Sequence, residues 1–244
     1  MECLGRSGRS IRGNFVSAEP KLVIFDVDGT LVDSQAHIVA SMAAAFEAVQ
    51  LAVPERERIL SIVGLSLPVA IAELAPGASA SILDTMVQRY KDAYTGLRSM
   101  DGDAASPLFA GAREVLDRLG AHDNILLGIA TGKSRRGLRH LFDLHGFAPL
   151  FVTSQTADDH PSKPHPAMVL AALAETGVDP KNAVMIGDTS FDMEMGRAAG
   201  VRTMAVTWGY HPGERLARCQ PDATVDNFAA LHAAILNSLE LTDD

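Results

Sequence analysis

The stretch that decides the fold is KLVIFDVDGTLVDS, residues 21–34. It is apolar from Leu22 to Phe25, which is typical of a strand buried on both faces of a sheet. Asp26 and Asp28 follow directly. Burying an unpaired carboxylate costs roughly several kcal/mol. Two acids at the end of the most hydrophobic strand therefore require a partner that offsets this cost.

Short apolar runs recur along the chain, and amphipathic helical patterns separate the later ones. The predicted strands are 22–25, 125–130, 150–154, 183–187 and 203–206, and the predicted helices between them are 134–144, 165–176 and 189–199. Apolar strands that alternate with such helices are typical of parallel sheets covered on both faces. The sequence therefore predicts an α/β fold with a doubly wound, Rossmann-like parallel sheet.

One interval interrupts this alternation. Between residues 34 and 103 there is no convincing strand, and helix-like stretches cover 36–49, 67–75 and 79–98. The segment SMDGDAASP, 99–107, has the composition of a linker that returns to the sheet. We therefore predict an α/β core of residues 20–33 and 104–244, with residues 34–103 inserted as an α-helical cap domain.

The first 19 residues differ from the rest in composition. They carry Arg6, Arg9 and Arg12 among Gly and Ser residues, with few acids. We interpret 1–19 as a basic flexible N-terminal extension. A targeting peptide, a disordered tail and a start-site artefact all remain open for it.

Composition excludes several classes of partner. The net charge of −9 argues against nucleic acid, because phosphate backbones require a basic surface. No apolar run reaches the roughly 18 residues that indicate a membrane span. The two cysteines, Cys3 and Cys219, form neither a disulfide framework nor a zinc-site spacing, which favours a reducing, cytoplasmic location. The sequence does not indicate the oligomeric state.

Polar side chains follow four of the predicted strands. They are Asp26 and Asp28 after the first, Thr131, Gly132 and Lys133 after the second, Lys163 in SKPHP after the third, and Asp188 and Asp192 in GDTSFDM after the fourth. Taken singly, each could be a turn, a helix cap or a solvated loop residue. Ligands of doubly wound sheets bind beyond the carboxyl ends of the strands, however, so the combination indicates one site.

The residue types at these strand ends indicate a metal and a phosphoryl group. Close carboxylates suit a hard cation such as Mg²⁺, which keeps several waters and bridges to phosphate. A hydroxyl, a backbone N–H and a lysine suit the oxygens of a phosphoryl group. A divalent metal would neutralise the acids that end the first strand and leave one of them facing phosphorus.

Four motifs in this chain resemble those of a known family. FDVDGTLVDS, ATGK, SKPHP and GDTSFDMEMGRAAG occur in the order seen in the haloacid dehalogenase-like hydrolases, and resemble the phosphoglycolate phosphatase-like branch. The likeness extends over almost the whole chain after Pro20 and includes a helical cap inserted after the first motif. It implies Mg²⁺-dependent hydrolysis of a small phosphorylated metabolite, a phosphoglycolate-like monoester, through an aspartyl-phosphate intermediate.

The resemblance also implies catalytic and metal-binding roles. Asp26 would be the nucleophile that attacks phosphorus. Asp28 would protonate the leaving oxygen and then deprotonate the attacking water. Mg²⁺ would be held by the Asp26 carboxylate, the Asp28 backbone carbonyl and Asp188.

The remaining motif residues would bind phosphate or support the residues that do. Thr131 and the Gly132 N–H would contact phosphoryl oxygens, and Lys163 would stabilise the charge on the phosphoryl group and the nucleophile. Asp192 would lie behind them, bonded to Lys163 or to a metal-bound water.

This sequence departs from the motifs of other members of the family, and these departures weigh against their activities. Haloacid dehalogenases lack the second acid of the first motif, so Asp28 weighs against dehalogenation. The loop 62–68, IVGLSLP, has no lysine for phosphonate cleavage and no cation to hold the second phosphate of a sugar phosphomutase. Phosphomutases also carry a histidine where Ile38 aligns, and we interpret the neighbouring His37 as an ordinary helix-surface residue.

Three alternatives to a phosphoglycolate-like phosphatase remain open. Two are enzymes of the same family, a β-phosphoglucomutase-like sugar phosphomutase and an inorganic pyrophosphatase. The third is a phospho-aspartate receiver module, which is disfavoured because receivers carry no helical insertion after the first strand. The apolar loop 62–68 favours a leaving group that is small or uncharged.

Overall fold

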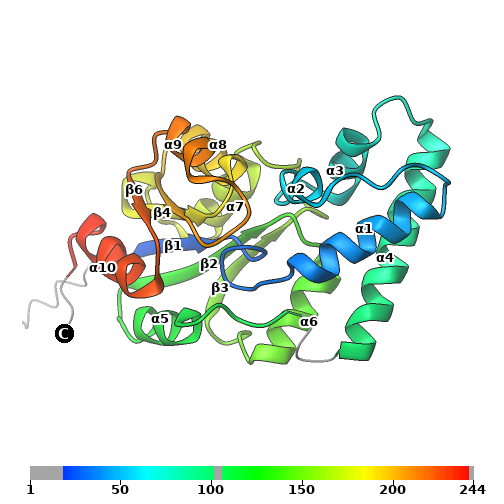
Figure 1. Cartoon of the computed structure of the whole chain (residues 1–244). Helices are drawn as coiled ribbons and strands as arrows, with labels where there is room; N and C mark the ends of the chain where they lie inside the picture. Colours follow the sequence, from blue (N-terminus) through cyan, green and yellow to red (C-terminus); the bar gives the residue numbers. More distant parts are fainter. Residues whose placement is uncertain (1–18, 102–105, 242–244) are drawn as a thin grey trace, which may run out of the picture.

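The computed structural model describes residues 19–101 and 106–241. The basic extension predicted for 1–19 lies outside the described residues apart from Glu19, and so do residues 102–105 of the linker predicted at 99–107. The prediction is wrong for residues 99–101, which continue a helix. The described chain contains a six-stranded parallel sheet in the order β3-β2-β1-β4-β5-β6 (Figure 1). Its strands are β1 (Lys21–Phe25), β2 (Ile125–Thr131), β3 (Phe151–Thr156), β4 (Ala183–Gly187), β5 (Arg202–Val206) and β6 (Ala223–Val225). The predicted doubly wound sheet is confirmed.

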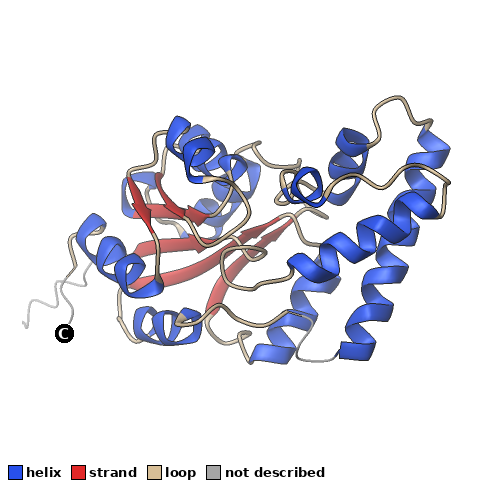
Figure 2. Cartoon of the chain, viewed as in Figure 1, coloured by secondary structure: helices blue, strands red, loops and turns tan. Residues whose placement is uncertain are grey.

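Helices cover both faces of this sheet (Figure 2). Val23 and Phe25 of β1 belong to one apolar cluster, whereas Leu22 and Ile24 belong to another. The first cluster includes side chains of α5 (Ala112–Gly120), α6 (Arg135–His145) and α10 (Phe228–Ser238), and the second includes side chains of α7 (Ala167–Thr176) and α8 (Ser190–Ala198). The short helices η2 (Pro180–Asn182) and α9 (Gly213–Arg218) complete this part of the chain. Burial on both faces explains why β1 is apolar at consecutive positions.

Four further helices lie beyond the strand ends, to the right of the sheet in Figure 1. They are α1 (Gln35–Glu47), α2 (Arg56–Leu60), α3 (Leu67–Leu74) and α4 (Ala80–Asp101). They share an apolar cluster of their own, with Ile38, Met42 and Phe46 on one face of α1 and Met86 and Val87 on α4. Because this cluster is separate from those that pack on the sheet, we propose that the four helices form the cap domain predicted for 34–103.

The chain leaves and re-enters the core at adjacent points. The Asp33 N–H donates a hydrogen bond to the Pro107 carbonyl, with an N···O distance of 2.9 Å. The two connections to the cap therefore lie side by side, as in a hinge.

The predicted elements agree with the observed ones to within three residues, but some elements were not predicted. These are α2, α5, α9, α10, η2 and β6. Helix α2 has five residues and β6 has three, which is too short for a periodic pattern to be recognised. None of the described helices is both long and apolar enough to cross a bilayer.

The interpretation of His37 as a helix-surface residue is wrong. Its side chain is only 7% exposed and lies edge-on to Tyr94, with ring centroids 6.1 Å apart. Helix α1 packs along α4, and this packing places His37 inside the cap.

Candidate active site

The site begins where β1 ends. The Asp26 N–H still bonds to the Ile186 carbonyl of β4, at 2.9 Å, so the Asp26 carboxylate stands at the edge of the sheet. Gly29 then turns the chain with a φ of +86°. A Cβ atom at Gly29 would lie 2.3 Å from Asp188 Oδ2. Glycine is therefore required there both for the backbone angle and for the space that Asp188 occupies.

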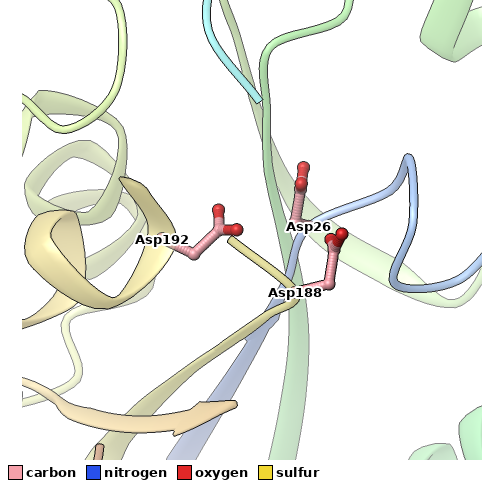
Figure 3. A group of neighbouring side chains, drawn as sticks. All are labelled: Asp26, Asp188 and Asp192. Carbon is pink, nitrogen blue, oxygen red and sulfur yellow. The ribbon is translucent and has the colours of Figure 1, made fainter. Parts of the chain in front are cut away.

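Three buried acids meet at the ends of β1 and β4 (Figure 3). Carboxylate oxygens of Asp26, Asp188 and Asp192 all lie within 4.8 Å of one another. One ammonium faces them, because Lys163 Nζ lies 2.8 Å from Asp26 Oδ1 and 2.6 Å from Asp192 Oδ1. The four side chains are at most 1% exposed. Three carboxylates and one lysine leave the buried cluster short of positive charge.

The charge balance changes the acidity of the cluster. Burial raises the pKa of Asp26 to about 7, against an opposing effect of Lys163, and Asp192 raises it further. Burial, followed by the charges of Asp192 and Asp26, raises the pKa of Asp188 well above its ordinary value. Burial would lower the pKa of Lys163, but Asp192 and Asp26 together raise it. A cation beside Asp26 and Asp188 would relieve this excess of negative charge.

The hydrogen bonds indicate which acids have room for a metal. No described residue makes a hydrogen bond to Asp26 Oδ2. Asp188 accepts one hydrogen bond on each oxygen, from Thr30 Oγ1 at 2.9 Å and from the Tyr210 N–H at 2.8 Å. Each oxygen of this carboxylate therefore keeps a further acceptor position. An all-oxygen, negatively charged donor set of this kind fits Mg²⁺.

Asp192 is committed differently. Its Oδ1 accepts a hydrogen bond from Lys163, and its Oδ2 accepts two, from the Thr189 N–H and from Thr189 Oγ1 at 2.6 Å. The bond from the Thr189 N–H, together with the bond that the Asp192 N–H donates to Thr189 Oγ1, forms the capping box at the start of α8. Asp192 is thus placed to hold Lys163 against Asp26.

Thr131 and Gly132 lie at the end of β2. The Thr131 side chain is buried, and its Oγ1 accepts a hydrogen bond from the Lys133 N–H at 3.2 Å. A Cβ atom at Gly132 would lie 2.6 Å from the Gly64 carbonyl oxygen and 2.7 Å from that of Leu65. The loop 62–68 therefore lies directly against Gly132.

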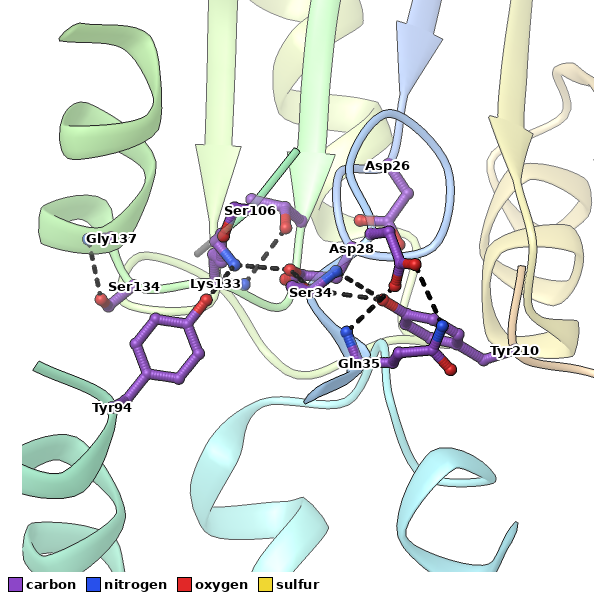
Figure 4. A network of polar contacts seen from close by, with 12 residues as sticks. Asp26, Asp28, Ser34, Gln35, Tyr94, Ser106, Lys133, Ser134, Gly137 and Tyr210 are labelled. Atoms are coloured by element: carbon purple, nitrogen blue, oxygen red, sulfur yellow. Dashed lines mark hydrogen bonds and ion pairs between the residues drawn. The ribbon is translucent and has the colours of Figure 1, made fainter. Parts of the chain in front are cut away.

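The Asp28 side chain is joined to Ser34 and Lys133 (Figure 4). Its Oδ1 accepts hydrogen bonds from Ser34 Oγ and from Lys133 Nζ, the latter at 2.5 Å. The Tyr210 hydroxyl accepts a hydrogen bond from the Ser34 N–H at 3.1 Å. The donors that hold Asp28 are therefore a neutral hydroxyl, that of Ser34, and a cationic ammonium, that of Lys133.

Polar contacts fasten the cap to the core. The Ser61 carbonyl at the end of α2 accepts hydrogen bonds from His211 Nε2, at 3.0 Å, and from Arg215 Nη1, at 3.2 Å. His211 Nδ1 accepts from the Ser190 N–H at 2.9 Å, and burial together with Arg215 lowers the pKa of His211 to about 4. A second contact joins the Ser66 N–H to Ser162 Oγ at 2.8 Å.

Sequence reasoning missed several residues of this site, above all Tyr210, Thr30 and Ser34. Tyr210 follows β5, an element whose carboxyl end was not predicted to contribute to the site. The rule that ligands bind at the carboxyl ends of strands would have found it there. Thr30 and Ser34 belong to the first motif, and only the folded turn reveals that they bond to Asp188 and Asp28.

The sequence of this chain is similar to those of several known proteins. Residues 23–206 match the family model described as haloacid dehalogenase-like hydrolase. The chain is 32% identical to a probable phosphatase IndB from Dickeya dadantii, over 91% of this chain and 96% of that protein. It is 32% identical to the pyrophosphatase PpaX from Bacillus pumilus, over 87% and 95% of the two chains. It is 28% identical to a phosphoglycolate phosphatase from Pectobacterium atrosepticum, over 84% and 88%.

A solved structure agrees with the fold. The haloacid dehalogenase-like hydrolase SP0104 from Streptococcus pneumoniae superposes with a TM-score of 0.76 at 25% identity. The likeness covers 88% of this chain and 98% of the other.

Proposed function

This chain belongs to the haloacid dehalogenase-like hydrolases, in the phosphoglycolate phosphatase-like branch, and is a phosphoric monoester hydrolase, for which we propose a Mg²⁺-dependent, covalent mechanism at Asp26. The observation that carries this proposal is the Asp26 carboxylate. It is buried, no described residue donates a hydrogen bond to its Oδ2, and it lies 2.8 Å from Lys163. Lys163 thus engages one oxygen of this carboxylate, and the other oxygen is available to a metal or to phosphorus.

In the first half-reaction, an Asp26 oxygen attacks phosphorus in line with the leaving group. The new Asp26–phosphorus bond forms as the ester bond breaks, and Asp28 gives its proton to the leaving oxygen. Thr131 and the Gly132 N–H hold phosphoryl oxygens. Lys163 stabilises the charge shared by the nucleophile and the phosphoryl group.

In the second half-reaction, Asp28 takes a proton from water, which attacks phosphorus and releases Asp26 and inorganic phosphate. Asp192 positions Lys163 throughout through its hydrogen bond at 2.6 Å. The metal would be held by the Asp26 carboxylate, the Asp28 backbone carbonyl and Asp188, and when bound it supplies charge stabilisation for the transferring group. The proposal includes a cytoplasmic location, which the scarcity of cysteine supports.

The substrate class is tested by a panel of phosphate monoesters assayed with Mg²⁺, with kcat/KM reported for each. We expect phosphoglycolate and related small esters to be preferred, because the chain is similar to phosphoglycolate phosphatases. A preference for pyrophosphate, or phosphoryl transfer between two positions of a sugar without hydrolysis, would replace phosphoglycolate-like hydrolysis by one of the two family alternatives.

Metal removal should abolish activity. Several kcal/mol of transition-state stabilisation corresponds to a loss of about 10²-fold or more on treatment with EDTA. Added Mg²⁺ should restore the rate, whereas Ca²⁺ should restore little of it, because its larger and more flexible coordination relaxes the alignment of nucleophile and phosphate. The measurement is kcat after EDTA treatment and after titration with each ion. Full activity in metal-free buffer would contradict the roles of Asp26 and Asp188 as ligands.

Closure of the cap is tested by Gly132→Ala. The substitution keeps the backbone N–H, but its Cβ would collide with the carbonyl oxygens of Gly64 and Leu65, so the cap loop must move away. A displacement of about 1 Å can cost about 10²-fold in rate, and we expect a loss in kcat/KM of that order. X-ray scattering should detect a more open cap in the presence of Mg²⁺ and a phosphate mimic. Gly213→Ala is the matched control, because a Cβ there meets no atom within 4 Å.

A further inference from the structure

A second lysine faces the site from the end of β2. Lys133 follows Thr131 and Gly132, and its Nζ lies 2.5 Å from Asp28 Oδ1. The two side chains are 11% and 13% exposed. Lys163 is already paired with Asp26 and Asp192, so Lys133 is the cation that lies on the leaving-group side of Asp28.

The cap contributes a partner to this lysine (Figure 4). Lys133 Nζ lies 3.5 Å from the Tyr94 hydroxyl and 5.5 Å from the centroid of the Tyr94 ring. Tyr94 is carried by α4, whereas Lys133 belongs to the core, so this contact exists only when the cap is closed. Of the three N–H groups of Lys133, the described residues engage two, through Asp28 and Tyr94.

A second basic side chain, Arg98 of the cap, lies near Lys133. A crevice between α4 and α6 is lined by Tyr94, Lys133, Arg98 and His140, together with small and apolar side chains. Burial and the nearby Arg98 lower the pKa of His140, with Asp143 opposing them. Arg98 thus adds positive charge on the cap side of Lys133. The crevice itself has a volume of about 10 Å³, room for about one water molecule, so an anion that binds Lys133 must approach from the side of Asp28.

We propose that Lys133 binds an anionic group on the leaving half of the substrate, a carboxylate or a second phosphate, and so selects esters with a charged leaving group. This inference rests on the proposed function, and it refines the expectation of a small or uncharged leaving group to one that is small and anionic. A carboxylate one carbon away from the leaving oxygen can contact Lys133 while that oxygen contacts Asp28. The anion displaces Asp28 from Lys133, which leaves the Asp28 carboxyl group to serve the leaving oxygen.

The test is the variant Lys133→Met, assayed with Mg²⁺ on phosphoglycolate, pyrophosphate and 2-hydroxyethyl phosphate. Phosphoglycolate and 2-hydroxyethyl phosphate differ mainly in whether a carboxylate or an alcohol faces Lys133. A hydrogen bond to a charged group contributes about 1.5–3 kcal/mol, so we expect the preference for phosphoglycolate over 2-hydroxyethyl phosphate to fall by about 10- to 150-fold. An equal loss for pyrophosphate identifies a general anion site, and a loss confined to phosphoglycolate identifies a carboxylate site.

The ratio of two substrates separates recognition from damage to Asp28. Phosphoglycolate and 2-hydroxyethyl phosphate both require Asp28. A lysine that only positions this acid would therefore lower kcat/KM equally for the two esters, and that result would overturn the proposal. Arg136→Met is the matched control, since Arg136 is an exposed cation on α6 outside the crevice, and it should leave the ratio unchanged.

A binding measurement keeps the inference testable if the proposed function fails. Calorimetry on the Asp26→Asn protein with Mg²⁺ should find tighter binding of phosphoglycolate than of 2-hydroxyethyl phosphate. Adding Lys133→Met should remove most of this difference. Absence of turnover with every ester would overturn the proposed function alone, whereas equal affinities for the two esters would overturn the role of Lys133. If Lys133→Met does not fold, equal affinities in the Asp26→Asn protein would still overturn the role of Lys133.

Discussion

Asp26→Asn should eliminate turnover, with a loss in kcat on the order of 10⁶-fold, the size of effect seen when other enzymes lose their nucleophile. An amide is a poor nucleophile and cannot carry the phosphoryl group as a mixed anhydride. The measurement is kcat on p-nitrophenyl phosphate and on phosphoglycolate, with intact mass to detect a phosphorylated chain. Neither turnover nor a phosphorylated form should be found in this variant. Appreciable residual activity would sink the covalent mechanism.

The same variant should remain folded, and the pKa of Asp26 explains why. Burial raises this pKa to about 7 from 3.8, so the folded chain holds a proton that the unfolded chain releases near pH 4. In the absence of metal, this acid therefore lowers the stability of the fold as pH rises from about 4 to 7, and the full penalty is present at pH 8. Asparagine is neutral and removes this penalty. The Tm of metal-free Asp26→Asn at pH 8 should equal or exceed that of the metal-free parent.

Much of the core and of its site could be predicted because both depend on local pattern. Consecutive apolar residues such as Leu22 to Phe25 indicate a strand covered on both faces, and the structure places the two sets of side chains in separate clusters. The carboxyl ends of parallel strands meet at one edge, so Asp26 and Asp188 are brought together by topology alone. The rule that the carboxyl ends of parallel strands share one edge was sufficient for that step.

The contacts between cap and core could not be predicted in this way. Tyr94 reaches Lys133, and His211 reaches Ser61, only because two separately packed units close on each other. His37 was misread for a related reason within the cap, since its burial depends on α4, which lies about 50 residues further along the chain. A helical pattern identifies the face that packs within its own cluster, but it does not identify a partner from another unit.

The acid–base role proposed for Asp28 is supported by the donors that hold it, which differ from those of Asp26. It lies two residues beyond Asp26, yet its carboxylate accepts hydrogen bonds from Ser34 and Lys133, whereas Asp26 faces Lys163. In the proposed mechanism, one motif thus supplies both the nucleophile and the acid for the leaving group, and different donors hold the two. Glycine at position 29 makes this arrangement possible by turning the chain around Asp188.

Asp28→Asn should lower kcat for alkyl phosphates by about 10²–10⁴-fold, the usual contribution of general acid–base catalysis. The amide oxygen introduced by this substitution can still accept hydrogen bonds from Ser34 and Lys133, so the turn should keep its geometry. Mg²⁺ affinity, measured by calorimetry, should be retained, because the backbone carbonyl at this position is the proposed ligand. The loss therefore reports the missing proton and not a damaged site.

The two half-reactions of Asp28→Asn should respond differently to the leaving group. p-Nitrophenolate leaves with little need of a proton, so phosphorylation of Asp26 by p-nitrophenyl phosphate should be the step least affected. Hydrolysis of the aspartyl-phosphate still requires a base, so this form should accumulate and add the mass of a phosphoryl group to the intact protein. Phosphoglycolate, whose leaving group needs a proton, should give a much smaller initial burst. Normal rates with alkyl phosphates, or a loss of Mg²⁺ affinity in place of acid–base function, would show that the proton is carried by a group other than Asp28.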